Sequence, residues 1–171
     1  MIRLRPLEEG DVELVWRGWQ FEDIRQSILL EDDATLDLQE AMAFVFFSRG
    51  KGSSGRDMAI ECDGAFAGCL MWHYGKGFYS QMAEIGYWVL PEHRGRGIAT
   101  QAIEEAMRFL FDTRGVHRIQ AQVFAGNAAS ECALQRAGFV HEATLTDLFF
   151  LEEKRYDCHV YAAIAQDKSP E

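Results

Sequence analysis

A glycine-rich turn between an apolar strand pattern and an amphipathic helix constrains this chain more than any other feature. The segment 82–90 has the pattern of a strand, which Pro91 closes. The segment 97–113 carries apolar side chains on one helical face, and 118–124 alternates apolar and polar residues as a strand does. A strand, a crossover helix and a second strand form a unit with parallel strands. The fold must therefore contain a sheet with at least one parallel pair beside this turn.

The other segments predict strands that follow one another closely along the chain. Asp63-Gly64 is a strong hairpin dipeptide between two of them. The predicted strands are 2–5, 58–62, 66–74, 82–90, 118–124, 139–151 and 156–164; the predicted helices are about 11–21, 36–46, 97–113 and the short stretch between Asn127 and Gly138. Consecutive hairpins pair antiparallel. We predict an α/β (α+β) fold with one mixed, mostly antiparallel sheet of about seven strands, flanked by about four helices.

Length and charge limit the class of protein. A chain of 171 residues predicts one domain, which we place at 1–166 with a frayed tail at 167–171. Lys and Arg number 17 against 27 Asp and Glu, a net charge of −10 that repels phosphate backbones and anionic membranes. We expect no nucleic-acid or membrane partner. The longest apolar run, 41–47, is too short to span a bilayer, and no signal-peptide pattern begins the chain, so we expect a cytoplasmic protein.

The cysteines and histidines argue against a metal site. Cys62, Cys69, Cys132 and Cys158 lie apart in apolar stretches with no C-x-x-C pair, so we expect buried, reduced thiols. The histidines show none of the usual zinc-site spacings, and we expect no metal. Cys132 has no histidine near it in sequence, which disfavours a covalent acyl-enzyme at that thiol.

The turn at 91–100 has the composition of an anion site. Its glycines lack Cβ atoms, so the backbone can turn tightly and a ligand can approach closely. The main-chain N–H groups that converge at the positive end of the following helix belong to Gly95, Arg96, Gly97, Ile98, Ala99 and Thr100. Arg94 and Arg96 add local positive charge to an acidic protein. Such an arrangement suits a diphosphate.

Two other interpretations of the turn compete with a diphosphate site. A dinucleotide fingerprint would need a third glycine where Thr100 stands, and an acidic residue near the end of the next strand. That strand offers only Gln120, Gln122 and Phe124, which disfavours dinucleotide binding. The second interpretation is a turn that merely connects two elements, and the glycines alone do not decide against it.

Several spaced motifs resemble the GNAT superfamily of N-acetyltransferases. Arg94-x-x-Gly97-x-Ala99 is similar to its R/Q-x-x-G-x-G/A signature. The strand Glu84-Ile85-Gly86-Tyr87-Trp88-Val89 precedes it, and Asn127-x-x-Ser130 and Ala137-Gly138-Phe139 follow. From 83 to 164 the chain resembles the RimJ/RimL-like branch, the ribosomal-protein-alanine N-acetyltransferase type.

The resemblance implies acetyl-CoA as cosubstrate, with no metal. Its pyrophosphate would rest on the amides of 95–100, and its pantetheine arm would pair with the strand at Tyr87, Trp88 and Val89 where the parallel strands splay apart. An N–H near Val89 would face the thioester oxygen, where negative charge develops during acyl transfer. Asn127 would both cap its helix and bind the arm.

The resemblance also suggests two catalytic residues. An amine is mostly protonated near neutral pH, so a base must remove a proton, and Glu84 lies on the strand entering the cleft. Much of the superfamily protonates the leaving thiolate with a Tyr, but Leu134 occupies that position here, and Ser130 is the alternative donor. Glu84 could equally be a solvated carboxylate, and Ser130 a residue that satisfies a helix backbone group.

We therefore expect direct transfer of acetyl to a primary amine in a ternary complex, most favourably to a protein N-terminal α-amine. A small amine such as a polyamine or an antibiotic is the enzymatic alternative. A non-catalytic CoA-binding sensor is a further alternative, which Leu134 keeps open. Trp16, Trp19 and Tyr156 could line the acceptor site, although the two tryptophans have helical core spacing. The oligomeric state stays open, with a homodimer among the alternatives.

Overall fold

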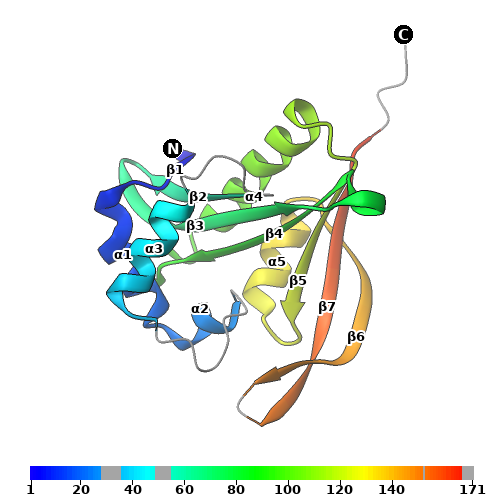
Figure 1. Cartoon of the computed structure of the whole chain (residues 1–171). Helices are drawn as coiled ribbons and strands as arrows, with labels where there is room; N and C mark the ends of the chain where they lie inside the picture. Colours follow the sequence, from blue (N-terminus) through cyan, green and yellow to red (C-terminus); the bar gives the residue numbers. More distant parts are fainter. Residues whose placement is uncertain (28–35, 49–54, 152, 167–171) are drawn as a thin grey trace.

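Seven strands form one sheet in the order β1-β2-β3-β4-β5-β7-β6 (Figure 1). This computed structural model describes residues 1–27, 36–48, 55–151 and 153–166, so the predicted tail at 167–171 lies outside the described residues. The strands are β1 Ile2–Pro6, β2 Gly55–Cys62, β3 Ala65–Tyr74, β4 Met82–Val89, β5 Arg118–Phe124, β6 Val140–Leu151 and β7 Lys154–Ile164. Only β4 and β5 pair in parallel, so the predicted mixed, mostly antiparallel sheet is confirmed.

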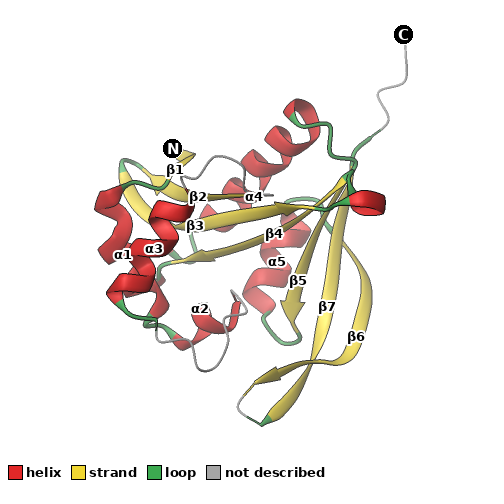
Figure 2. Ribbon diagram, viewed as in Figure 1, coloured by secondary structure: helices red, strands yellow, loops and turns green. Residues whose placement is uncertain are grey.

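The helices differ from the predicted set in two respects. They are α1 Val12–Trp19, α2 Glu22–Ser27, α3 Leu38–Ser48, α4 Ile98–Arg108 and α5 Ala128–Arg136, with short 3-10 turns at Glu9–Asp11, Gly77–Tyr79 and Pro91–His93 (Figure 2). The predicted helix over 11–21 ends at Trp19, and α2 follows as a separate helix. Six residues with one large apolar side chain, Ile24, give no periodic signal. The end of α4 is also altered, because Phe109–Thr113 forms a π-helical turn.

Helices cover both faces of the sheet. One hydrophobic cluster joins α4 and α5 to strand residues such as Ile85 and Ile119. The other joins α1, α2 and α3 to the opposite face, where Trp88 and Cys69 lie. Successive strand residues point to opposite faces, so Tyr87 belongs to the α4–α5 face and Trp88 to the α1–α3 face.

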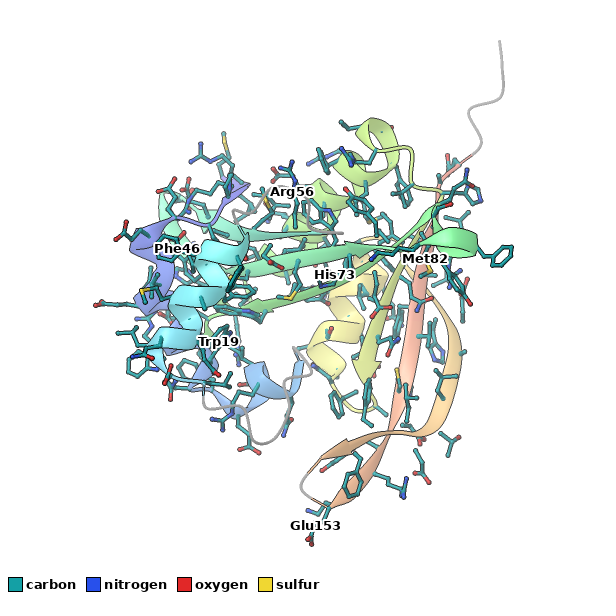
Figure 3. All side chains as sticks on the ribbon, in the orientation of Figure 1. Trp19, Phe46, Arg56, His73, Met82 and Glu153 are labelled. Carbon is teal, nitrogen blue, oxygen red and sulfur yellow. The ribbon has the colours of Figure 1, made fainter. Side chains whose placement is uncertain are left out.

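The parallel pair comes apart after three residues. Met82 to Glu84 pair with Arg118 to Gln120, and no further pair joins the two strands in the described chain. Beyond that point β4 continues beside β3 while β5 continues beside β7, and Figure 1 shows the two strands diverging. Figure 3 marks Met82 at the joined end. We call the point of separation, at Glu84 and Gln120, the fork.

Candidate active site

A pocket of ≈ 330 Å³ lies where the end of β4, the turn at 91–100, α2 and α5 meet. Most of its wall comes from the strand, the glycine-rich turn and the helices that carry the predicted site residues. It is lined by Asp23, Ile24, Tyr87, Trp88, Val89, His93, Arg94, Gly95, Gly97, Ile98, Ala99, Thr100, Asn127, Ala129, Ser130, Cys132, Ala133 and Arg136. The two predicted site residues that do not line it are Glu84 and Arg96.

The glycine turn has the backbone geometry of an anion cradle. Gly95 and Gly97 both have φ of +72°, the left-handed region that residues with a Cβ disfavour. The first main-chain bond of α4 runs from the N–H of Gln101 to the carbonyl of Gly97. The N–H groups of 98–100 precede that bond, so they belong to the positive helix end that attracts phosphate. The turn therefore fits a diphosphate group.

The two predicted arginines take different directions. Arg94 donates from Nε to the carbonyl of Val89 at 2.9 Å, and its Nη1 lies 2.6 Å from Asp23 Oδ2. It thereby ties α2 to the end of β4. Arg96 reaches instead toward Asp63, 4.0 Å away in the β2–β3 hairpin. Its predicted contribution to the cradle is limited to its main chain and its long-range charge.

Two hydroxyl groups meet on the pocket wall. Tyr87 Oη lies 2.7 Å from Ser130 Oγ and 3.2 Å from the Ser130 carbonyl oxygen. Burial raises the pKa of Tyr87 to about 12, although the Ser130 contact partly offsets the effect. Asn127 accepts the Ser130 N–H on its side-chain oxygen at 3.2 Å, so its predicted role as a helix cap is confirmed. Leu134, one turn further along α5, is fully buried.

Glu84 lies at the fork, on the other face of β4 from Tyr87. It pairs with His73 on β3 and Gln120 on β5, and Gln120 Nε2 lies 3.5 Å from Glu84 Oε2. Burial raises the pKa of Glu84, while the nearby His73 and the Gln120 contact partly oppose the rise. A half-buried carboxylate of this kind is a stronger base than one in water.

Cys132 corrects one prediction. Cys62, Cys69 and Cys158 are buried as expected, but Cys132 is exposed and lines the pocket. The α5 residues on the pocket wall lie at 129, 130, 132, 133 and 136. At 3.6 residues per turn these positions form a broad face centred near 129 and 133, with Ser130 at one edge and Cys132 at the other, so counting turns from Ser130 would not have found Cys132. Nor did any sequence signal point to the two α2 residues, Asp23 and Ile24.

The three aromatic residues predicted as candidates for the acceptor site lie in different parts of the fold. Trp19 is buried and packs edge-on against Phe44, while Trp16 is 39% exposed. Neither lines the pocket. Tyr156 packs at 5.7 Å against Phe124, at the far end of β5. Figure 3 places Trp19 between α1 and α3, away from the β5–β7 part of the sheet.

The described ranges contain neither a metal-ligand cluster nor a membrane-spanning helix. No group of three or more His, Cys, Asp or Glu side chains there is arranged to hold a metal ion. None of the helices in the same ranges has the length and apolarity to cross a membrane.

Comparisons with known proteins agree with this architecture. The model of the acetyltransferase (GNAT) domain matches residues 2–140. The uncharacterized N-acetyltransferase YoaA of Bacillus subtilis is 26% identical over 94% of this chain and 92% of its own. The ribosomal-protein-serine acetyltransferase of Escherichia coli is 31% identical over 50% of this chain and 48% of its own.

A solved structure shares the fold. The spermidine N-acetyltransferase of Vibrio cholerae, determined with CoA and spermine, superposes with a TM-score of 0.80 at 22% identity, over 95% of both chains. The domain match, which spans most of the sequence, and the likeness to the N-acetyltransferase YoaA favour an enzyme over a non-catalytic sensor. The chain belongs to the acetyltransferase (GNAT) domain family and is an acetyl-CoA-dependent N-acetyltransferase.

Proposed function

We propose that this enzyme acetylates the N-terminal α-amine of a protein, with Glu84 as the general base at the fork. The observation that carries the proposal is the position of Glu84, a half-buried carboxylate where β4 and β5 part. The pocket reaches both faces of β4, because Trp88, on the same face as Glu84, and Tyr87, on the other face, both line it. Glu84 itself does not line the pocket and lies four residues before Trp88 on the same strand.

The main chain of the turn and of β4 would hold acetyl-CoA. The N–H groups of 95–100 would bind the pyrophosphate, and the β5-side edge of β4 beyond Glu84 would pair with the pantetheine arm. Arg94 binds the Val89 carbonyl, and the Val89 N–H would face the thioester oxygen. Acetyl-CoA supplies the activated acetyl group; the residues bind, orient and accept a proton.

Glu84 would take the proton that the attacking amine must lose. An α-amine has a pKa of about 7.7–8.0, so much of it is protonated at neutral pH. The raised pKa of Glu84 brings the two groups closer in basicity and eases the transfer. Gln120 restrains the carboxylate without adding charge.

The charge pattern around Glu84 supports an acceptor with one ammonium group. Within the described residues of β3, β4 and β5, Glu84 is the only carboxylate on the α1–α3 face. Its paired neighbours on that face are His73 and Gln120. A polyamine carries several ammonium groups and is best bound by several carboxylates. The ribosomal-protein-serine relative supports a protein acceptor; the Vibrio cholerae structure supports the polyamine alternative.

A panel of acceptors tests the proposal. Peptides with free N-terminal Ser, Ala or Met, the same peptides with blocked N-termini, and spermidine are each incubated with acetyl-CoA, and free CoA thiol is measured. We expect turnover on free N-termini and none on blocked ones. Preferential turnover of spermidine would replace the protein acceptor by the polyamine.

A further inference from the structure

We infer that the Tyr87 hydroxyl is a positioning group, which aims the Ser130 hydroxyl at the sulfur of the departing CoA. The inference rests on the proposed function, because it assumes that the pantetheine arm follows the pocket past Ser130. The family resemblance connects Tyr87 with the cofactor only through its main chain, and the inference assigns a role to its side chain. It also explains how the site can stabilise the leaving sulfur although Leu134 offers no hydroxyl.

The contact joins two elements that the fold brings together from distant parts of the chain. Tyr87 comes from β4 and Ser130 from the first turn of α5, and both line the pocket. Their side-chain oxygens are 2.7 Å apart, a normal distance for a hydrogen bond between hydroxyls. The Asn127 cap fixes the Ser130 main chain at the same time. Ser130 is therefore held from two sides.

The proton arrangement follows from the raised pKa of Tyr87. With a pKa of about 12, the phenol keeps its proton over the working range and has one hydrogen to donate. The Ser130 carbonyl, at 3.2 Å, can only accept that hydrogen, whereas in the 2.7 Å contact with Ser130 Oγ either hydroxyl can be the donor. The carbonyl already serves the helix, so the shorter bond to Oγ is the better use of that hydrogen. Ser130 then keeps its own hydrogen for a third atom in the pocket.

The accepted bond also makes Ser130 a better donor, because hydrogen bonds in a chain polarise one another. In the reaction, the amine nitrogen bonds to the acetyl carbon and the carbon–sulfur bond breaks, its electron pair remaining on sulfur. The amine proton goes to Glu84. Ser130 donates a hydrogen bond to the sulfur, and neither it nor Tyr87 gives up a proton. A phenol with so high a pKa is suited to this role and poorly suited to proton transfer.

No other hydroxyl is placed to do the same from α5. Leu134 is apolar and fully buried, so it offers nothing to the pocket. The exposed Cys132 also lines the pocket, but a thiol is a weak donor. Of the described residues that line the pocket, Ser130 is the one whose hydroxyl is oriented by a second side chain.

The test measures how much the sulfur contributes to binding, without any acceptor. Calorimetry gives the Kd of CoA and of desulfo-CoA at a pH above the pKa of the CoA thiol, where the bound sulfur is a thiolate. We expect wild type to prefer CoA, and Tyr87→Phe to reduce that preference on the order of tenfold, the worth of one charge-assisted hydrogen bond. Ser130→Ala should reduce it equally. The double variant should lose no more than either single one.

Two further readouts separate positioning from structural damage. In the acetyl transfer assay, Tyr87→Phe should lower kcat while the KM for acetyl-CoA and the shape of the pH profile stay unchanged. The control is Tyr74→Phe, which removes a partly buried hydroxyl that accepts from Trp72 Nε1 at 3.1 Å, outside the pocket. It should lower stability but leave the sulfur preference intact.

Three results would overturn the inference. Additive losses in the double variant would mean that the two hydroxyls act independently. An alkaline limb that disappears in Tyr87→Phe would make Tyr87 a proton donor instead. If wild type binds CoA and desulfo-CoA equally well, Ser130 does not contact the sulfur of the leaving group. If wild type does not bind CoA at all, the proposed function itself is contradicted.

Discussion

Glu84 is the general base of the proposed reaction, and the burial of its charged form lowers the stability of the fold. Strand alternation predicted from sequence that it shares a face with Gly86 and Trp88, and the burial pattern agrees. The sequence could not predict its neighbours His73 and Gln120, because those come from strands whose pairing depends on the whole sheet. Its raised pKa is therefore a property of the fold rather than of the motif.

Glu84→Gln should remove the base and spare the binding site. We expect kcat to fall about 10²- to 10⁴-fold near neutral pH, the usual contribution of a general base. The rate should recover in part at higher pH, where more of the amine is already deprotonated. Glu13→Gln, the same change on the exposed side of α1, is the control and should be neutral. A loss of equal size at every pH would contradict the base role.

The same variant should be more stable than wild type at neutral pH. A carboxyl whose pKa is raised in the folded state binds protons more tightly there than in the unfolded chain, so its stability cost appears as pH rises through the folded pKa. Glutamine never carries that charge. Thermal unfolding should give Glu84→Gln a higher Tm at pH 7, with the gain disappearing below about pH 4, the range of an ordinary Glu. A lower Tm at pH 7 would show that the charged form is favoured.

At the scale of elements, hydrophobic periodicity predicted the long helices and strands. The strand 118–124 has the predicted bounds, and the turn at 91–100 lies between strand and helix as expected. The predicted helix 11–21 concealed a break, and α2, which brings Asp23 and Ile24 to the pocket, was not predicted. Short helices take their stability from packing, here the burial of Ile24, which a single sequence does not reveal.

The packing of α1 on Trp88 couples an element outside the pocket to the pocket wall. A Cβ on Gly18 would lie 2.6 Å from two ring atoms of Trp88, so Gly18→Ala must move the helix or the indole. We expect a lower Tm and weaker binding of acetyl-CoA by calorimetry, because Trp88 lines the pocket.

Gly10→Ala is the matched control, since a Cβ there meets no atom within 4 Å. It should leave both the Tm and the affinity near wild type. If Gly18→Ala kept full affinity despite a lower Tm, the indole would not contribute to the ligand side of the wall.

At the scale of the molecule, the active site depends on a sheet that divides. One part, β1 to β4, carries α1 and α3; the other, β5 to β7, extends beyond the fork to the hairpin tip marked by Glu153 in Figure 3. The sequence predicted the parallel pair, while the splaying and the cofactor's place came from the family resemblance. The order that puts β7 between β5 and β6 was not predictable, since it results from long-range pairing.

The central claim is that main-chain amides at 95–100 bind the pyrophosphate of acetyl-CoA. Calorimetric titration of wild type, Gly95→Ala and Gly115→Ala tests it directly, because both glycines have positive φ and open space where a Cβ would stand. Both variants pay a similar strain of about 1 kcal/mol, but only the first changes the cradle. We predict tight binding by wild type and Gly115→Ala and clearly weaker binding by Gly95→Ala. Equal affinity in all three proteins, or no heat from wild type, would contradict the account.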